Sequence, residues 1–452
     1  MKKNFISIRG TDFVKNEKKF KIRGVAIGSF LNLEHFMLKI AGVETDIKGV
    51  FAEIYGAEKS EIFWKTFRSC FINEKDFEFM KKININTIRL PFNYKLFFDD
   101  NLPFMLKKEG FLELDRIIEM ATKYEIYVIL DLHAAPGGQN PDWHSDNSTG
   151  EPLFWKFFDF QQRIINLWGE IAKRYKNNPY ILGYDILNEP VIENREISGK
   201  FVNDFYKKVL REIRKFDRNH IVFLEGDFYA SDTTSFEILD DPLVAYSVHY
   251  YPFFFTDIEH YSKLNETEKK EWLKSSLFNN VSITDVFNRL KRPLWCGETG
   301  ALLSFPKSYS ENQLQKILEI FEENNISWTI WTYKDAGCMG ILHCKDESPW
   351  VKNFENVNAY RDFLKDFNAA TKLALEFIKN ISPNLFPNIE LIRKVKFKLL
   401  SIRDMTTSEN LKLKLKEIPF EKVLTLPESF LFENCEMWNG AINIIKKITS
   451  KI

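Results

Sequence analysis

Two short stretches, residues 184–190 (YDILNEP) and 293–300 (PLWCGETG), decide the fold of this chain. Each is a largely apolar run that ends close to a glutamate, Glu189 or Glu298. A run of this length and composition is typical of a buried parallel strand. Polar side chains at the carboxyl ends of parallel strands meet at one edge, where parallel barrels keep their chemistry. The two glutamates, 109 positions apart, are therefore predicted to face one site.

The rest of the chain repeats this pattern. Eight β-like runs alternate with segments of helical periodicity, which indicates parallel βαβ units with right-handed crossovers. The runs are residues 22–28, 87–92, 127–133, 181–189, 220–226, 244–251, 293–300 and 326–333. Helical periodicity is found in residues 60–82, 110–124, 152–175, 199–216, 266–290, 312–324 and 358–379. Eight such units predict a closed (β/α)8 TIM barrel, a fold of the α/β class.

Three connections that follow strands are unusually long: residues 29–59, 134–151 and 334–357. Structureless loops of this size inside a compact domain are usually lids or binding loops, so we expect them to border the site. The catalytic barrel is predicted to span residues 1–380. Residues 381–452 are expected to form a C-terminal extension packed on the barrel, and the sequence assigns it no role. The alternation of apolar and polar residues at 395–399 predicts at least one strand there.

Composition excludes several classes of partner. Lys and Arg together number 63, as do Asp and Glu, so no net charge favours nucleic acid or an anionic membrane. Residues 1–10 lack the apolar core of an export signal, and no apolar run is long enough to cross a membrane. The five scattered cysteines are typical of reduced thiols. We expect a cytoplasmic protein, and the oligomeric state stays open.

Paired carboxylates suit one reaction in particular. Two glutamates that face one glycosidic bond can act as acid/base and nucleophile in retaining glycoside hydrolysis, which needs no metal or cofactor. As the nucleophile, Glu298 would have to stay ionised, with Arg89 and Tyr251 as candidate neighbours. As the acid, Glu189 would have to hold a proton, which a drier setting and the nearby charge of Glu298 would favour.

Polar and aromatic residues at the ends of other strands point to the same site. Taken singly, Arg89 could be a salt-bridge residue, His133 a satisfied core histidine and Trp331 simple packing. With Glu298 they occupy the same end of six strands, for which coincidence is a poor explanation. All are therefore predicted to lie together: Arg89, His133, Asn188, His249, Tyr251 and Trp331. The Asn188 amide could hydrogen-bond a sugar 2-hydroxyl, and Trp331 offers a flat face to a pyranose ring.

A metal site is a weaker interpretation of the sequence. Cys338, His343 and Cys344 lie close together, but no C-x-x-C pair exists, so ordinary thiols near a loop are favoured. The aromatic run 253–255 could clamp a second sugar or serve as loop core.

Taken together, these residues resemble the active-site set of glycoside hydrolase family 5 of clan A. The resemblance covers roughly residues 20–335 and includes LNEP at 187–190 and GETG at 297–300. It implies a (β/α)8 barrel with the acid/base at the end of strand four and the nucleophile at the end of strand seven.

Within that family, residues 23–34 (RGVAIGSFLNLE) and 131–140 (DLHAAPGGQN), followed by DNS at 146–148, are similar to the exo-β-1,3-glucanase branch. This likeness implies that Glu34 holds hydroxyls of the terminal sugar. The chain departs from the branch at residues 28–30, where Gly-Gly-Trp is usual, and in a long insertion after Glu34. These departures leave the linkage and the sugar open.

The predicted function is therefore a retaining β-glycoside hydrolase that is exo-acting on short β-gluco-oligosaccharides. The alternative on the same scaffold is an endo-acting β-1,4-glucanase, or a β-mannanase or β-mannosidase. A barrel that binds carbohydrate without cleaving it is disfavoured, because it would be expected to have lost one of the two glutamates.

Overall fold

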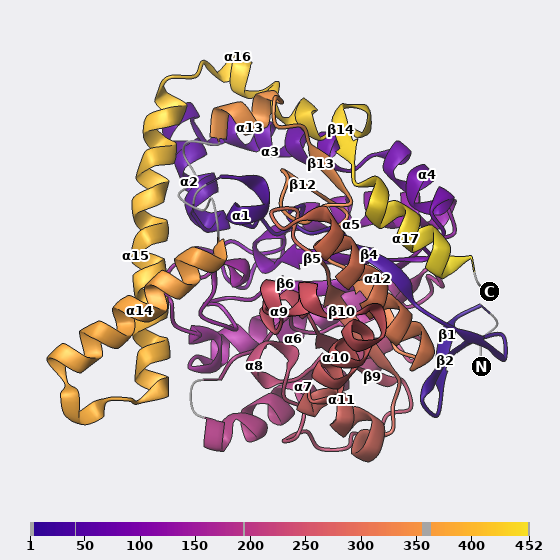
Figure 1. The fold of residues 1–452 in the computed structure, drawn as a ribbon. Helices are drawn as coiled ribbons and strands as arrows, with labels where there is room; N and C mark the ends of the chain where they lie inside the picture. Colours follow the sequence, from indigo (N-terminus) through magenta and orange to yellow (C-terminus); the bar gives the residue numbers. More distant parts are fainter. Residues whose placement is uncertain (1–3, 41, 193–194, 355–362, 451–452) are drawn as a thin grey trace.

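The computed structural model describes residues 4–40, 42–192, 195–354 and 363–450, with a closed barrel at its centre (Figure 1). The barrel strands run parallel and pair in chain order until β11 closes on β4. They are β4 (Arg23–Ala26), β5 (Thr87–Asn93), β6 (Tyr127–Ala134), β7 (Ile181–Asp185), β8 (Ile221–Glu225), β9 (Val244–His249), β10 (Leu294–Thr299) and β11 (Ser327–Ile330). The predicted (β/α)8 barrel is confirmed, and each strand falls on one of the eight predicted runs.

Helices surround this barrel (Figure 1). Those that follow the strands include α4 (Glu74–Lys82), α5 (Glu109–Lys123), α6 (Phe158–Tyr175), α7 (Arg195–Phe216), α10 (Glu266–Phe278) and α12 (Lys307–Glu323). Helix α5 illustrates how they pack, through an apolar stripe that includes Leu114, Ile117 and Ala121. Side chains three and four positions apart share one face of a helix, so these stripes bury against the strands.

Two of the predicted helices are divided in the structure. Residues 60–82 contain most of α3 (Ala57–Phe71) and all of α4. The segment is divided because the Asn73 side chain accepts the Lys75 backbone N–H and caps the start of a new helix. Residues 266–290 divide in the same way at Asn280, which caps α11 (Val281–Asp285). The prediction of one continuous helix in each segment is wrong, since the spacing of apolar residues does not show where a side chain caps a new helix.

A short antiparallel sheet lies at the amino end of the barrel strands. It consists of β1 (Ile6–Arg9), β2 (Asp12–Lys15) and β3 (Lys18–Phe20). Ile6 and Phe13 of this sheet pack with Ile22, Phe223 and Trp295 in one buried apolar cluster. Because side chains cover this end, a substrate has to approach the barrel from the carboxyl ends of its strands.

Two of the three long connections contain regular structure and are not the structureless loops that we expected. Residues 29–59 contain α1 (His35–Leu38) and α2 (Glu44–Tyr55), and α2 is held by buried apolar residues at helical spacing. Within 334–354, the described part of the third connection, lie β12 (Lys334–Asp335), β13 (Leu342–Cys344) and α13 (Pro349–Phe354). Only residues 134–151 form a loop, interrupted by a single short turn at Trp143–Ser145.

The last part of the chain wraps around the barrel helices. It contains α14 (Phe363–Ile381), α15 (Ile389–Lys416), α16 (Phe420–Val423), β14 (Cys435–Met437) and α17 (Asn439–Thr449). The predicted helix 358–379 corresponds to α14, although its residues 358–362 lie outside the described part. The strand predicted at 395–399 is wrong, because these residues lie within α15. Buried positions along α15 recur every three or four residues, and this helical period prevails over the short alternation.

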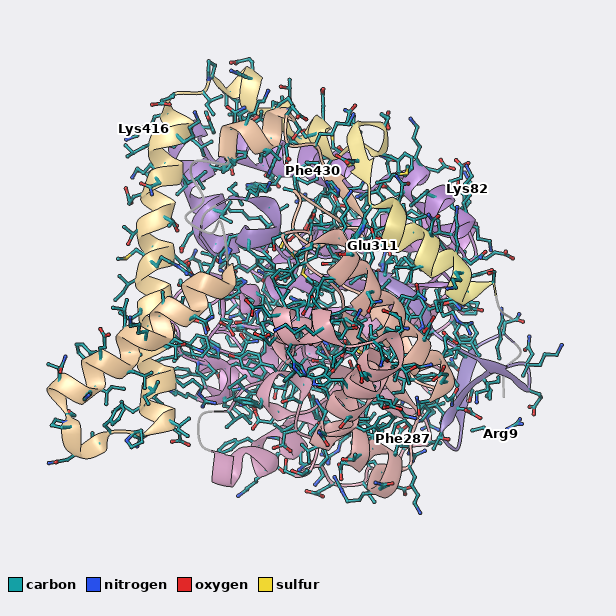
Figure 2. The ribbon with its side chains drawn as sticks, in the orientation of Figure 1. Arg9, Lys82, Phe287, Glu311, Lys416 and Phe430 are labelled. Carbon is teal, nitrogen blue, oxygen red and sulfur yellow. The ribbon has the colours of Figure 1, made fainter. Side chains whose placement is uncertain are left out.

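Several contacts join this segment to the barrel layer. Strand β14 pairs with β13, and α17 packs along α12 (Figure 1). Figure 2 labels Phe430, whose ring packs against Phe67, Phe71 and Trp350, and Glu311, which accepts the indole N–H of Trp438.

None of the described helices combines the length and apolar character needed to cross a membrane. All five cysteines lie in the described part, and each is an unpaired thiol.

Candidate active site

Arg89, on β5, is the centre of the hydrogen bonding at the carboxyl end of the barrel. Its side chain is fully buried. The guanidinium donates to four acceptors: Asp185 at 3.0 Å, Asn188 at 2.8 Å, Glu225 at 3.0 Å and Glu298 at 2.5 Å. A buried cation is tolerated only when fixed anions surround it. Arg89 therefore ties the ends of four strands into one charged network.

Glu298 lies near the end of β10, inside this network. One of its carboxylate oxygens accepts from Arg89, and the other accepts from the Tyr251 hydroxyl at 2.6 Å. His249 Nδ1 lies 3.6 Å from the second oxygen. Burial raises the pKa of Glu298 above its ordinary value, and the positive charges of His249 and Arg89 only partly oppose this.

Glu189 follows β7 in a strained backbone conformation. Its φ of 47° lies in the left-handed region, which residues with a Cβ rarely adopt. Glu225 accepts the Glu189 backbone N–H at 2.7 Å, and the Asn140 amide donates to the Glu189 carbonyl at 3.0 Å. Strain that surrounding contacts hold in place is typical of functional sites.

Two histidines contact the Glu189 carboxylate. His249 Nδ1 lies 2.7 Å from one oxygen, and His144 Nε2 lies 3.1 Å from the other. Burial raises the pKa of Glu189, but the hydrogen bonds from His144 and His249 outweigh burial and leave this pKa well below its ordinary value. These directions apply to the free protein. Sequence analysis considered neither His144 nor the burial of Glu298, and both act on this pair of carboxyls.

The two carboxylates lie close enough to act on one bond. Within the described chain, Glu189, His249 and Glu298 each place one ligand atom within 4.8 Å of the other two. Oxygens this close are incompatible with the roughly 6.5–9.5 Å that separates the carboxyl groups of inverting glycosidases. The same three side chains could in principle hold a metal ion. Both Glu298 oxygens are already engaged by Arg89 and Tyr251, and the adjacent guanidinium repels a cation.

A cavity of about 320 Å³ lies above the carboxylate pair. It brings together seven of the predicted residues: Glu34, His133, Glu189, His249, Tyr251, Glu298 and Trp331. The other two predicted residues, Arg89 and Asn188, are fully buried and do not line the cavity. The Asn188 amide contacts the Arg89 guanidinium and lies 3.5 Å from His133.

His133, which lines this cavity, lies between two carboxylates. Its Nδ1 lies 2.7 Å from Asp131 and its Nε2 lies 3.5 Å from Glu34. Burial lowers the pKa of His133, but the charges of Asp131 and Glu34 outweigh burial and raise it to about 10. The Trp331 ring stacks on the His133 ring with centroids 5.1 Å apart. The result is a flat aromatic surface beside a carboxylate.

Comparison with known proteins identifies the family. A sequence profile described as cellulase (glycosyl hydrolase family 5) matches residues 43–337, which is more than half of the chain. The chain belongs to glycosyl hydrolase family 5. The family resemblance drawn from the sequence is confirmed, and the protein is a glycoside hydrolase.

This family 5 chain is similar to glycosidases with different names. A beta-xylosidase from Phanerodontia chrysosporium is 36% identical over 375 residues, which cover 80% of this chain and 76% of the relative. A probable glucan 1,3-beta-glucosidase A from Aspergillus fumigatus is 24% identical over 363 residues, covering 71% and 84%. The solved structure of an endoglucanase from Thermotoga maritima superposes with a TM-score of 0.51 at 20% identity, covering 71% and 91%, and shows the shared fold.

Sequence analysis missed four groups of this family 5 site: the buried Asp131, Asp185 and Glu225, and the partly exposed His144. Asp185 and Glu225 are the last residues of β7 and β8. The signal that singled out Glu189, a carboxylate at the end of an apolar run, could have found both. His144 lies in the loop 134–151, and no pattern in the sequence connects it with Glu189.

Proposed function

We propose that this family 5 enzyme cleaves β-glycosidic bonds by double displacement, with Glu298 as the nucleophile and Glu189 as the acid/base. The observation that carries the proposal is the close carboxylate pair, of which Glu298 alone accepts from Arg89 and Tyr251. Donors on both oxygens favour the ionised carboxylate that a nucleophile needs, and they oppose the effect of burial.

Each step then has a defined place for its proton. In the first step a Glu298 oxygen bonds to the anomeric carbon, the glycosidic C–O bond breaks, and the departing oxygen takes a proton from Glu189. In the second step water attacks the same carbon, gives a proton to Glu189 and displaces Glu298. Charged His144 and His249 favour the ionised form of Glu189 through their hydrogen bonds. Transfer of a proton along its 2.7 Å contact with His249 supplies the acid without solvent.

His144→Asn is expected to move the basic limb of the pH profile to higher pH. Charged His144 lowers the pKa of Glu189, so its loss raises that pKa, and the acid keeps its proton at higher pH. The profile of kcat/KM should be measured on a disaccharide, whose sugar leaving group needs the acid. A dinitrophenyl glycoside, whose leaving group does not, serves as the control. A basic limb that stays in place or moves down would contradict the contact proposed for His144.

The residues that line the cavity differ in their exposure. Trp143 and Trp331 are 8% and 3% exposed. Phe254 and Phe255 line the cavity as well, and they are 52% and 56% exposed. This difference supports a pocket that accepts a chain end beside Glu34 and releases the leaving group over the open aromatic residues.

A second hollow continues from the open end. It has a volume of about 400 Å³ and shares Phe255 and Asn280 with the main cavity. Its lining is completed by Tyr250, Trp272, Ser275, Ser276 and Asn279. Aromatic rings beside uncharged polar groups are suited to neutral sugars, so the hollow supports a leaving group of more than one sugar.

The proposed substrates are short β-gluco-oligosaccharides, attacked from the non-reducing end. The relative named as a glucan 1,3-beta-glucosidase supports this choice, and the more similar relative named as a beta-xylosidase makes β-xylosides the second candidate. Relatives named as endoglucanases keep internal cleavage as the alternative. A cytoplasmic location stays a prediction.

Glu34→Ala is expected to lower kcat/KM for gluco-oligosaccharides by roughly 10- to 100-fold. A buried carboxylate that accepts sugar hydroxyls contributes about 1.5–3 kcal/mol, and its loss affects every substrate that ends in the recognised sugar. Rates should be compared on gluco-, xylo- and manno-oligosaccharides. Rates close to wild type on all three substrates would show that Glu34 only pairs with His133 and does not bind the sugar.

The mode of attack is tested with a labelled hexasaccharide. Exo-action releases one sugar at a time, so the first products are a monosaccharide and a pentasaccharide. Early appearance of mixed mid-length products would show an open cleft and contradict the exo proposal.

A further inference from the structure

Helix α15 lies directly against the loop 134–151, although more than 230 residues separate them in sequence (Figure 1). Lys398 Nζ donates to the Thr149 carbonyl at 2.8 Å and pairs with Glu151 at 2.6 Å. One turn of the helix further on, the Ser401 hydroxyl donates to the Ser148 carbonyl. The helix therefore holds consecutive residues of this loop by their backbone.

The packing at this contact is tight. Gly150 has a φ of +67°, and a Cβ there would lie 2.8 Å from the Phe397 carbonyl oxygen. A side chain at this position would strain the backbone and also collide with α15. The contact thus depends on a glycine on the loop side and a fixed helix backbone on the other.

A second contact is apolar and lies behind the wall of the active-site cavity. Trp143, which lines the cavity, belongs to a buried cluster with Phe397 and Leu400 of α15 and Ala370 of α14. Phe397 and Leu400 are both 3% exposed. The helix pair α14 and α15 therefore forms a second layer that supports this wall.

The supported loop in turn holds the acid/base. Asn147 donates to the Asn140 carbonyl at 2.7 Å, and Asn140 donates to the Glu189 carbonyl at 3.0 Å. His144, between them in sequence, contacts the Glu189 carboxylate. An unbroken chain of contacts thus runs from α15 through the loop to both ends of the Glu189 residue.

We propose that α15, in the extension to which the sequence assigned no role, is a positioning element of the active site that sets the placement of His144 and Glu189 through the loop 134–151. This inference rests on the proposed acid/base role of Glu189. Phe397 is its central positioning residue, because its backbone lies against Gly150 and its side chain shares a buried cluster with Trp143.

The test compares two cavity-forming substitutions on the same helix. Phe397→Ala removes the support of the loop. Leu411→Ala also removes a fully buried apolar side chain of α15, but it lies 14 residues, or about 21 Å, further along the helix. Both variants are expected to lower the melting temperature. Only Phe397→Ala should lower kcat/KM on a disaccharide by about tenfold or more relative to a dinitrophenyl glycoside.

The pH profile gives a readout that stability alone would not change. In Phe397→Ala the basic limb should move to higher pH, as in His144→Asn, because the contact of His144 with Glu189 is weakened. Phe397→Leu should restore both the ratio of the disaccharide rate to the dinitrophenyl glycoside rate and the position of the basic limb. If Phe397→Ala does not fold, the double variant Lys398→Met with Ser401→Ala tests the same contact from the surface.

Two outcomes would overturn the inference. One is a rate ratio and basic limb at wild-type values in the Phe397 variant or in the double variant. The other is an equal change in Leu411→Ala, which would indicate a general loss of stability. Failure of the proposed function is distinct, since then Glu189→Ala itself would leave the disaccharide rate unchanged.

Discussion

Glu298→Gln is expected to reduce kcat by on the order of 10⁴-fold or more, without loss of folding. The amide keeps the shape of the carboxylate and an oxygen that can accept from Arg89, but it cannot form the covalent glycosyl intermediate. Removal of a nucleophile from a group of residues that act as a unit abolishes most of their joint effect. The measurement is turnover of a dinitrophenyl glycoside, with the melting temperature as a check on folding.

A matched substitution separates the two carboxylates. Glu189→Ala should lose activity on disaccharides but retain the first step on the dinitrophenyl glycoside, where no acid is needed. Added azide should then restore turnover as a glycosyl azide of retained configuration. A 2-fluoroglycoside that labels a residue other than Glu298, or azide rescue of the Glu298 variant in place of Glu189→Ala, would reverse or refute the assignment.

Arg89→Ala is expected to destabilise the protein by about 3–5 kcal/mol and to lower kcat/KM by at least 100-fold. Asp131, Asp185, Glu225 and Glu298 all lie within 3.2 Å of this guanidinium, and its loss leaves buried carboxylates without a cation. Uncompensated buried charge is the cause of the instability, and a misplaced nucleophile is the cause of the slower reaction.

The pH dependence of this loss has a definite sign. Arg89 lowers the pKa of Asp185 and Glu298, so its removal raises the folded-state pKa of both. Protonation then favours the folded state of the variant, and its deficit in unfolding free energy should shrink as the pH falls. Urea unfolding at several pH values measures this deficit, and one that grows toward low pH would contradict the argument.

Lys334→Met is the control for Arg89→Ala. Lys334 is also fully buried and pairs with Asp76 at 2.6 Å, but it does not line the cavity. It donates to the carbonyls of Phe71 and Phe430, so it joins the C-terminal segment to the barrel helices. We expect a comparable loss of stability with little change in kcat at low temperature. A similar fall in kcat would show that Arg89 acts through stability alone.

The barrel could be predicted from sequence because its strands are buried on both faces. Such strands are continuous apolar runs, and the runs at residues 127–133 and 181–189 were recognised without any knowledge of their neighbours. Two segments were predicted wrongly: helix α2 was expected to be part of a loop, and residues 395–399 of α15 were expected to form a strand. In both, a short local pattern was followed, whereas the structure depends on packing against distant residues.

The sequence by itself determined the fold and the family, and it predicted that Glu189 and Glu298 face one site. Each follows from local patterns: apolar runs, the residues that end them, and short motifs. The tertiary structure alone shows which groups surround the two carboxyls. Burial and the two histidines set the pKa directions of Glu189 and Glu298, and His144 reaches Glu189 only through a loop that α15 supports. Electrostatic effects depend on distance and burial in three dimensions, which separation along the chain does not measure.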